Sequence, residues 1–176
     1  MTSRKKPNTM PVYIRPETPA DAAAIEAVTI AAFLEAPHTG HNEQLIVAAL
    51  RQAGQLSVSL VAEHEGSIVG HVAFSPVTIS SGARAWYGLG PISVVPQRQR
   101  QGIGALLMRR GLAELRQSGA AGCVVLGDPA YYSRFGFKTE PALVLPDIPL
   151  EYFMALAFSG TVPRGTVGYH VAFTSP

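Results

Sequence analysis

Alternating apolar and polar positions predict an antiparallel meander in the first half of the chain. Residues 56–63 alternate between apolar and mostly polar side chains, which is the period of a half-buried strand. A turn at 64–67 returns the chain through a second strand at 68–79, and a turn at 80–84 leads into a third at 86–95. We expect these three strands to pair as neighbours in one sheet.

A helix and a crossover follow the meander. Apolar or small residues recur at helical spacing in Gly104, Leu107, Met108, Gly111, Leu112 and Leu115. A short buried strand at 123–126 comes next, and the strand–helix–strand order predicts that it lies parallel to the strand at 86–95. Asp128-Pro129 then begins a short helix that reaches Arg134.

The flanking segments complete the expected fold. A first strand at 12–15 precedes Thr18-Pro19-Ala20-Asp21, which is typical of a helix start, and that helix should run to Phe33. A second helix should stop at Gly54, and the apolar runs 152–158 and 167–173 are expected to be strands. The prediction is an α/β (α+β) domain with a mixed, mostly antiparallel central sheet flanked by helices.

Composition narrows the class of protein. The 176 residues suit one domain over 11–176, with 1–10 a flexible tail that lacks the apolar segment of a signal peptide. The sequence contains no run of 18 or more apolar residues, so we expect no membrane-spanning helix. Cys123 is the single cysteine and no cluster has metal-ligand spacing, so we expect a cytoplasmic protein with no metal.

Charge is uneven along the chain. A net charge of +2 gives little reason to expect a nucleic-acid partner, but residues 84–116 hold six arginines and one acid. This excess predicts an anionic ligand, or else an ordinary solvated helix face.

The segment Gln99-Arg100-Gln101-Gly102-Ile103-Gly104 carries the most chemical information. It joins a strand to a helix, whose free N–H groups and partial positive charge suit a phosphate or pyrophosphate. The spacing matches neither the dinucleotide fingerprint nor the P-loop. Taken alone, the two glycines fit close helix–strand packing equally well.

This segment resembles the [RQ]-x-x-G-x-[GA] motif of the GNAT superfamily of acyl-CoA-dependent N-acyltransferases. The preceding strand, the opening Ile14-Arg15-Pro16 with Asp21, and the Y-x-x-x-G-F pattern from Tyr132 to Phe137 are similar to that superfamily in the same order. Within it, residues 127–137 and Tyr152-Phe153-Met154 resemble the bacterial YhbS-like group of predicted N-acetyltransferases.

The resemblance implies acetyl-CoA as co-substrate and assigns roles to residues. The CoA pyrophosphate would be held by the amides of Arg100, Gln101, Gly102, Ile103, Gly104 and Ala105, and the pantetheine arm would pair with Ile92, Ser93 and Val94. Tyr132 falls where the family's general acid lies, although Tyr131 is an alternative. Val125 occupies the position of a family asparagine that binds pantetheine, so that contact is absent or made by Asp128 or a backbone group.

The reaction implied is acetyl transfer to a primary amine by direct attack in a ternary complex. Glu43, His41, His38 and His71 are candidate bases, and a strand position on the wet face is the simpler interpretation of His71. The sequence does not identify the amine acceptor. A catalytically silent acyl-CoA-binding or sensing module and a protein for another phosphate ligand are the alternatives, and the C-terminal strands would offer an edge for a homodimer.

Overall fold

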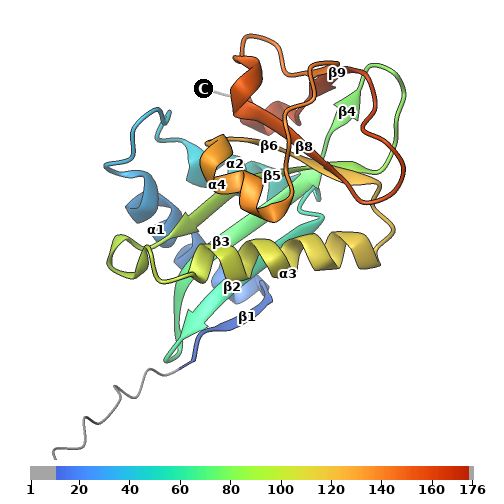
Figure 1. The fold of residues 1–176 in the computed structure, drawn as a ribbon. Helices are drawn as coiled ribbons and strands as arrows, with labels where there is room; N and C mark the ends of the chain where they lie inside the picture. Colours follow the sequence, from blue (N-terminus) through green and yellow to red (C-terminus); the bar gives the residue numbers. More distant parts are fainter. Residues whose placement is uncertain (1–10, 175–176) are drawn as a thin grey trace, which may run out of the picture.

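The computed structural model describes residues 11–174. The predicted flexible tail at 1–10 lies outside the described residues. A six-stranded sheet forms the centre of the molecule (Figure 1). In spatial order its strands are β1 (Tyr13–Pro16), β2 (Val58–His64), β3 (Ser67–Pro76), β5 (Trp86–Val94), β6 (Gly122–Leu126) and β8 (Phe153–Ala157).

All neighbouring strands of this sheet are antiparallel except β5 and β6, which are parallel. The predicted crossover and the mixed, mostly antiparallel sheet are therefore confirmed. A second sheet of three short strands, which the sequence did not predict, has the order β4 (Thr78–Ile79), β9 (Gly165–Gly168) and β7 (Leu143–Val144).

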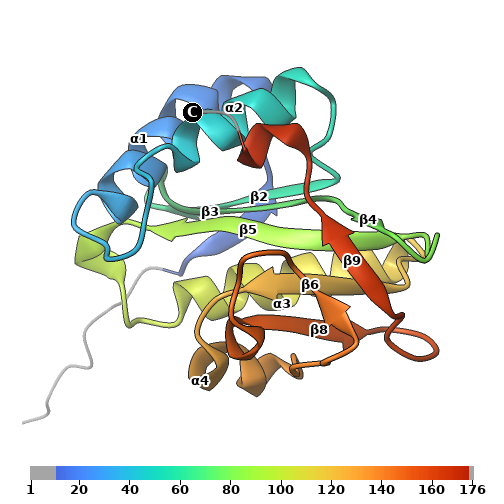
Figure 2. The ribbon, with the colours of Figure 1, turned by 90° about the horizontal axis from the view of Figure 1, so that it is seen from above.

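Helices cover both faces of the central sheet, as Figure 2 shows. One face carries α1 (Ala22–Phe33) and α2 (Glu43–Gln52), and the other carries α3 (Ile103–Gln117) and α4 (Pro129–Tyr132). Five short 3₁₀ helices complete the described chain: η1 (Pro19–Asp21), η2 (Pro96–Arg98), η3 (Ser133–Phe135), η4 (Leu150–Tyr152) and η5 (Val171–Phe173). None of the helices within residues 11–174 has the length and apolar character needed to cross a bilayer.

The predicted apolar stripe of α3 faces the sheet. Its residues Leu107, Met108 and Leu115 are fully buried against β2 and β3. Gly111 is required by close packing, because a Cβ there would lie 2.2 Å from Cε2 of Phe74. Glycine thus brings the helix down onto the sheet and fixes where its N-terminus lies.

The helix start at residues 18–21 also forms as predicted. The Thr18 N–H donates to Asp21 Oδ2 at 2.7 Å, and Arg15 donates to both Asp21 oxygens at 2.8 and 3.1 Å. The Arg15 guanidinium holds the pKa of Asp21 well below its usual range. This pair joins β1 to the first helical turn of the chain.

One predicted strand is wrong. The run 167–173 contains the end of β9, but residues 171–173 form the 3₁₀ helix η5. The His170 side chain accepts a hydrogen bond from the Ala172 N–H at 3.0 Å and so caps this turn. Ala172 and Phe173 then pack against α2, where a helical turn presents both residues to the same neighbour. The other apolar run forms β8 as expected.

Candidate active site

Strands β5 and β6 diverge after a short paired stretch. Their register runs only from Trp86 opposite Gly122 to Gly88 opposite Val124, whereas β5 continues to Val94 beside β3. The backbone of β5 beyond Gly88 therefore has an edge without a strand partner among the described residues. An unpaired edge of this kind accepts an extended ligand through main-chain hydrogen bonds.

The end of β5 shows which groups face this edge. The Val95 N–H donates to Val69 O of β3 at 2.9 Å, so this N–H points toward β3. Backbone groups alternate in direction along an extended strand, and Val94 and Ile92 therefore face the open edge. The Ser93 hydroxyl instead lies buried 3.4 Å from the Thr29 hydroxyl on α1.

The turn between β5 and α3 forms a cradle of backbone N–H groups. Arg100 and Gly102 have positive φ values of 63° and 85°, and these reverse the chain so that α3 begins at Ile103. The first helical bond of α3 runs from the Leu106 N–H to Gly102 O at 3.1 Å. The amides of residues 103–105 precede that bond and are available to an anion at the helix N-terminus.

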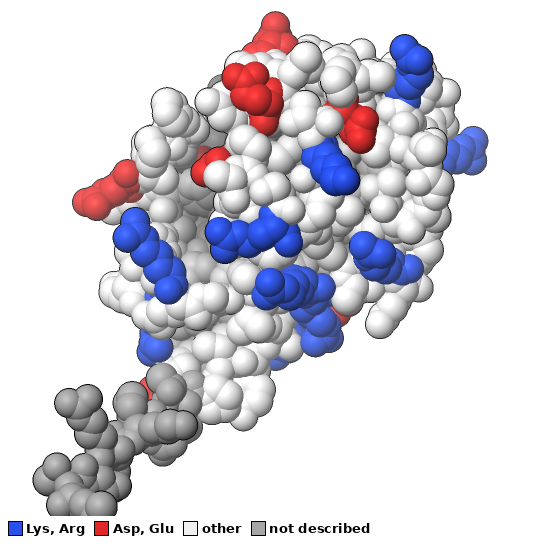
Figure 3. All heavy atoms as spheres, in the orientation of Figure 1, with Lys and Arg blue, Asp and Glu red and all other residues white. Residues whose placement is uncertain are grey.

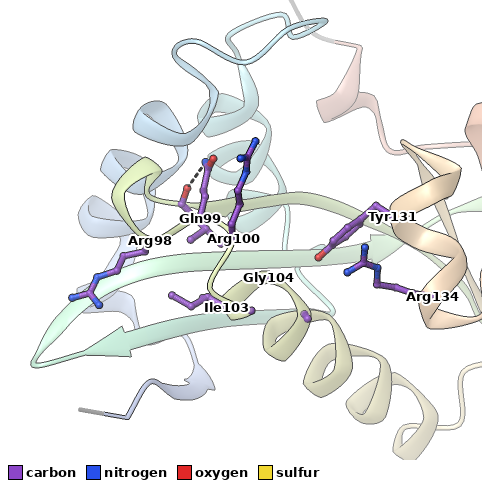
Figure 4. A pocket seen from close by; sticks show the side chains of 10 residues that line it. Arg98, Gln99, Arg100, Ile103, Gly104, Tyr131 and Arg134 are labelled. Carbon is purple, nitrogen blue, oxygen red and sulfur yellow. Dashed lines mark hydrogen bonds between the residues drawn. The ribbon is translucent and has the colours of Figure 1, made fainter. Parts of the chain in front are cut away.

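A cavity of about 460 Å³ opens over this cradle (Figure 4). Gly102, Gly104 and Ala105 form its floor, and Arg100 and Arg134 bring positive charge to its walls. Arginine and lysine side chains gather on this face of the molecule, around a hollow (Figure 3). The cavity thus combines free amides with cations, which is the environment a pyrophosphate requires.

Neighbouring contacts hold the loop that forms the cradle. The Gln99 side chain donates to Val94 O at 3.0 Å and ties the loop to the end of β5. The Arg98 guanidinium lies 2.9 Å from His64 Nδ1, and its side chain points away from the cavity in Figure 4. Gln101 donates to Gln97 O at 3.3 Å and is not part of the cavity wall.

Two adjacent tyrosines of α4 occupy different environments. Tyr131 lines the cradle cavity, and its hydroxyl would lie 3.3 Å from a Cβ at Gly104. Burial raises the pKa of Tyr131 above its ordinary value. Arg134 stacks 4.8 Å from the centre of its ring, so the phenol and the guanidinium approach the cradle together.

Tyr132 packs against the main core, beside Gly127 directly after β6. Its ring packs edge-on against Phe137 at 6.1 Å, and a Cβ at Gly127 would lie 2.4 Å from Tyr132 Cε2. Burial, with smaller effects of Tyr131 and Cys123, raises the pKa of Tyr132 to about 12. The phenol therefore keeps its proton at neutral pH, as a general acid must.

Cys123 is fully buried in β6, as the sequence predicts. Burial raises the pKa of its thiol well above the ordinary value, so the thiol is not a nucleophile. Val125 is also buried, and the Asp128 carboxylate accepts from the Ala130 N–H at 2.9 Å to cap α4. Asp128 is thus already engaged in helix capping.

A second cavity of about 660 Å³ lies on the face of the sheet that α1 and α2 cover. Leu89, Gly90 and Pro91 of β5 line it, directly after the last residue that pairs with β6. The two cavities thus border different parts of β5 beyond its pairing with β6: Val94 lines the first, and Leu89, Gly90 and Pro91 line the second.

Of the four candidate bases, Glu43 and His41 line one small cavity together, and the other two lie elsewhere. Glu43 lines the second cavity, whereas His38 and His41 are exposed in the preceding loop. His71 is fully buried, which corrects the wet-face interpretation; its Nε2 lies 2.7 Å from the Ser59 hydroxyl, and burial lowers its pKa to about 3. Within residues 11–174, no three His, Cys, Asp or Glu side chains are grouped to hold a metal ion.

Comparison with known proteins agrees with this geometry. Residues 55–139 match the family model of the acetyltransferase (GNAT) domain. The chain is 40% identical over 128 residues to the uncharacterized N-acetyltransferase YhbS of Escherichia coli K12. This match covers 72% of this chain and 74% of YhbS. The chain belongs to the GNAT family of N-acetyltransferases.

Solved GNAT structures share the fold over nearly the whole chain. A GNAT acetyltransferase from Brucella melitensis, crystallised with acetyl-CoA, is 51% identical, with a TM-score of 0.84 over 93% of this chain and 99% of that one. E. coli YhbS, crystallised with CoA, has the same TM-score at 33% identity, over 98% of this chain and 96% of that one.

Some residues of the candidate site were not predicted from sequence. Arg134 follows Tyr131 by three positions, a spacing that places both on one side of a helical turn, and this signal was available. Tyr169 and Leu145 of the second cavity carry no local signal, because only the three-stranded sheet brings them beside β5.

Proposed function

We propose that the protein transfers an acetyl group from acetyl-CoA to a primary amine by direct attack in a ternary complex. The observation that carries the proposal is that two cavities border the stretch of β5 beyond its pairing with β6. One has the free amides and cations that suit a pyrophosphate, and the other can admit a second substrate. Positioning two reactants in this way supplies much of the rate enhancement in such reactions.

The residues of the cradle fit the CoA pyrophosphate. A Cβ at Gly102 would meet no protein atom within 4 Å, so the space beside it is open to a ligand. The amides of Arg100, Gln101, Gly102, Ile103, Gly104 and Ala105 would hold the phosphates, with Arg134 and Tyr131 opposite them. The open edge of β5 at Ile92, Ser93 and Val94 would hold the pantetheine arm, mainly through residues 92 and 94.

Acetyl-CoA, when bound, supplies a thioester that an amine can attack. Tyr132 would donate its proton to the departing sulfur, because its raised pKa keeps the phenol protonated and its ring lies beside Gly127 directly after β6. Tyr131 would instead contact the CoA pyrophosphate in the cradle. This division follows from the two environments, since Tyr131 lines the cradle and Tyr132 does not.

Two further expectations remain part of the proposal. Residues 11–176 would act as one domain. The edge strand β8 would support a homodimer, although the hydrogen bonds between Lys138 and Ala155, at 2.8 and 3.0 Å, already cover part of that edge.

The test combines binding with turnover. Calorimetry should show selective binding of acetyl-CoA and CoA over ATP, and free-thiol release should depend on an added primary amine. Binding without release for any amine would instead favour the catalytically silent acyl-CoA-binding module. If neither CoA compound binds, both interpretations are wrong.

A further inference from the structure

The second cavity is lined mainly by apolar side chains that come from widely separated parts of the chain. Phe33 and Ile46 come from α1 and α2, Leu89 and Leu126 from the diverging strands, and Leu145 and Ile148 from the segment after β7. Its volume of about 660 Å³ lies within the range of small-molecule sites. An occupant of this space must bury an apolar body.

Glu43 is the only charged side chain among the described residues that line this cavity. The Thr39 hydroxyl donates to Glu43 Oε1, while Oε2 is buried and has no hydrogen-bond partner in the described chain. A buried carboxylate oxygen without a partner is costly unless a ligand supplies a donor. An ammonium group supplies both the donor and the opposite charge.

The same wall disfavours other amines. A polyamine would bring at least one further cation without an acid to pair with it, and an amino acid would bring a carboxylate without a cation. Each unpaired charge must lose its water on entering an apolar cavity, which is unfavourable. A cavity with one acid and otherwise uncharged walls therefore favours a ligand that has one positive charge and no other charged group.

We propose that the acceptor is a primary amine carried on an uncharged apolar body, with its ammonium group held by Glu43. This inference rests on the proposed function. In the transfer the N–C bond forms and the C–S bond breaks. Of the two protons that leave the ammonium nitrogen, Glu43 passes one to solvent and the second also reaches solvent. Tyr132 protonates the departing sulfur and regains a proton from solvent, so one proton is released overall.

The first experiment compares three probe amines by acetyl-CoA-dependent thiol release. Phenethylamine has the expected chemistry, phenylalanine adds a carboxylate to the same body, and spermidine is a flexible polycation. We expect kcat/KM for phenethylamine to exceed both others by about tenfold or more. A preference for spermidine or phenylalanine would overturn the inference while leaving acetyl transfer itself established.

Two variants test the role of Glu43. Glu43→Gln should raise KM for phenethylamine by about tenfold or more, since it removes one partner of a buried charge pair, with acetyl-CoA affinity unchanged in calorimetry. The exposed Glu35, outside the cavity wall, gives the matched control Glu35→Gln, which should behave as wild type. An unchanged KM in Glu43→Gln contradicts the proposal.

Adding a second acidic side chain to the cavity gives a test that does not require Glu43→Gln to fold. Leu126 lines the cavity and is 46% exposed, so Leu126→Glu adds a second carboxylate without opening the core. The ratio of kcat/KM for spermidine over phenethylamine should rise about tenfold. An unchanged ratio overturns the inference. If the wild-type protein does not bind acetyl-CoA, the proposed function itself is overturned.

Discussion

Gly88, the last residue of β5 that pairs with β6, lies against the ring of Tyr169. A Cβ at residue 88 would stand 2.5 Å from Tyr169 Cε1, so only glycine lets the ring reach the point where the strands diverge. The Tyr169 hydroxyl is buried and makes no hydrogen bond within the described chain, and burial raises its pKa well above the ordinary value. A protonated phenol without a partner thus lines the second cavity beside the gap.

This arrangement predicts that Tyr169→Phe weakens catalysis without weakening the fold. Removing a buried hydroxyl that lacks a partner should leave the free energy of unfolding unchanged or raise it by about 1 kcal/mol. The hydroxyl would hydrogen-bond to bound substrate, so its removal should lower kcat/KM about tenfold. Urea unfolding and steady-state kinetics measure the two effects, and a loss of stability with unchanged kinetics would refute the role.

The two tyrosines of α4 should separate binding from chemistry. Tyr132→Phe should lower kcat by about a hundredfold, the usual contribution of a general acid, with acetyl-CoA affinity within about twofold of wild type. Tyr131→Phe is the matched control one position away and should weaken CoA binding by up to about tenfold. The reverse pattern, measured by calorimetry and thiol release, would assign the acid to Tyr131.

The raised pKa of Tyr132 predicts a specific pH profile. An ordinary tyrosine loses its proton near pH 10, and its acid function would fail there. Because burial raises the pKa of Tyr132 to about 12, the protonated form persists, and kcat should not fall around pH 10. A decline in kcat centred near pH 10, under conditions where circular dichroism shows the fold intact, would contradict this assignment.

Asp21→Asn should destabilise the fold by about 2 kcal/mol, because it disrupts charged hydrogen bonds from Arg15 and Thr18. The folded pKa of Asp21 lies below the unfolded value of about 3.9, so the carboxylate stabilises the protein above that pH. This contribution disappears as pH falls below about 3.9. Unfolding by urea at neutral and acid pH should show the variant's deficit shrinking, whereas a constant deficit would argue against the ion pair.

The sequence predicted the parts of the site that local pattern encodes. The cradle at residues 99–105 lies within one strand–turn–helix unit, so the local pattern predicted the turn and the helix start, and the resemblance to the GNAT superfamily suggested their role. The strand pairing of β5 with β6 followed from connection order. These features depend on neighbours in sequence.

The sequence did not predict features that depend on distant contacts. Residues 171–173 are apolar in a run that suits a strand or a helical turn equally, and the contact with α2 decides the matter. Similarly, nothing local separates Tyr131 from Tyr132, because the cradle contact of one and the core contact of the other arise from tertiary packing. The second cavity draws on residues from 33 to 174 and has no local motif.

The central claim is that the turn before α3 binds the pyrophosphate of acetyl-CoA, and calorimetry with Gly104→Glu tests it most directly. This change places bulk and negative charge in the cradle, so Kd should rise about a hundredfold or more. Ala113→Glu, exposed on the same helix away from the cradle, controls for the added charge and should bind as wild type. Equal affinity of wild type and a folded Gly104→Glu would contradict the account.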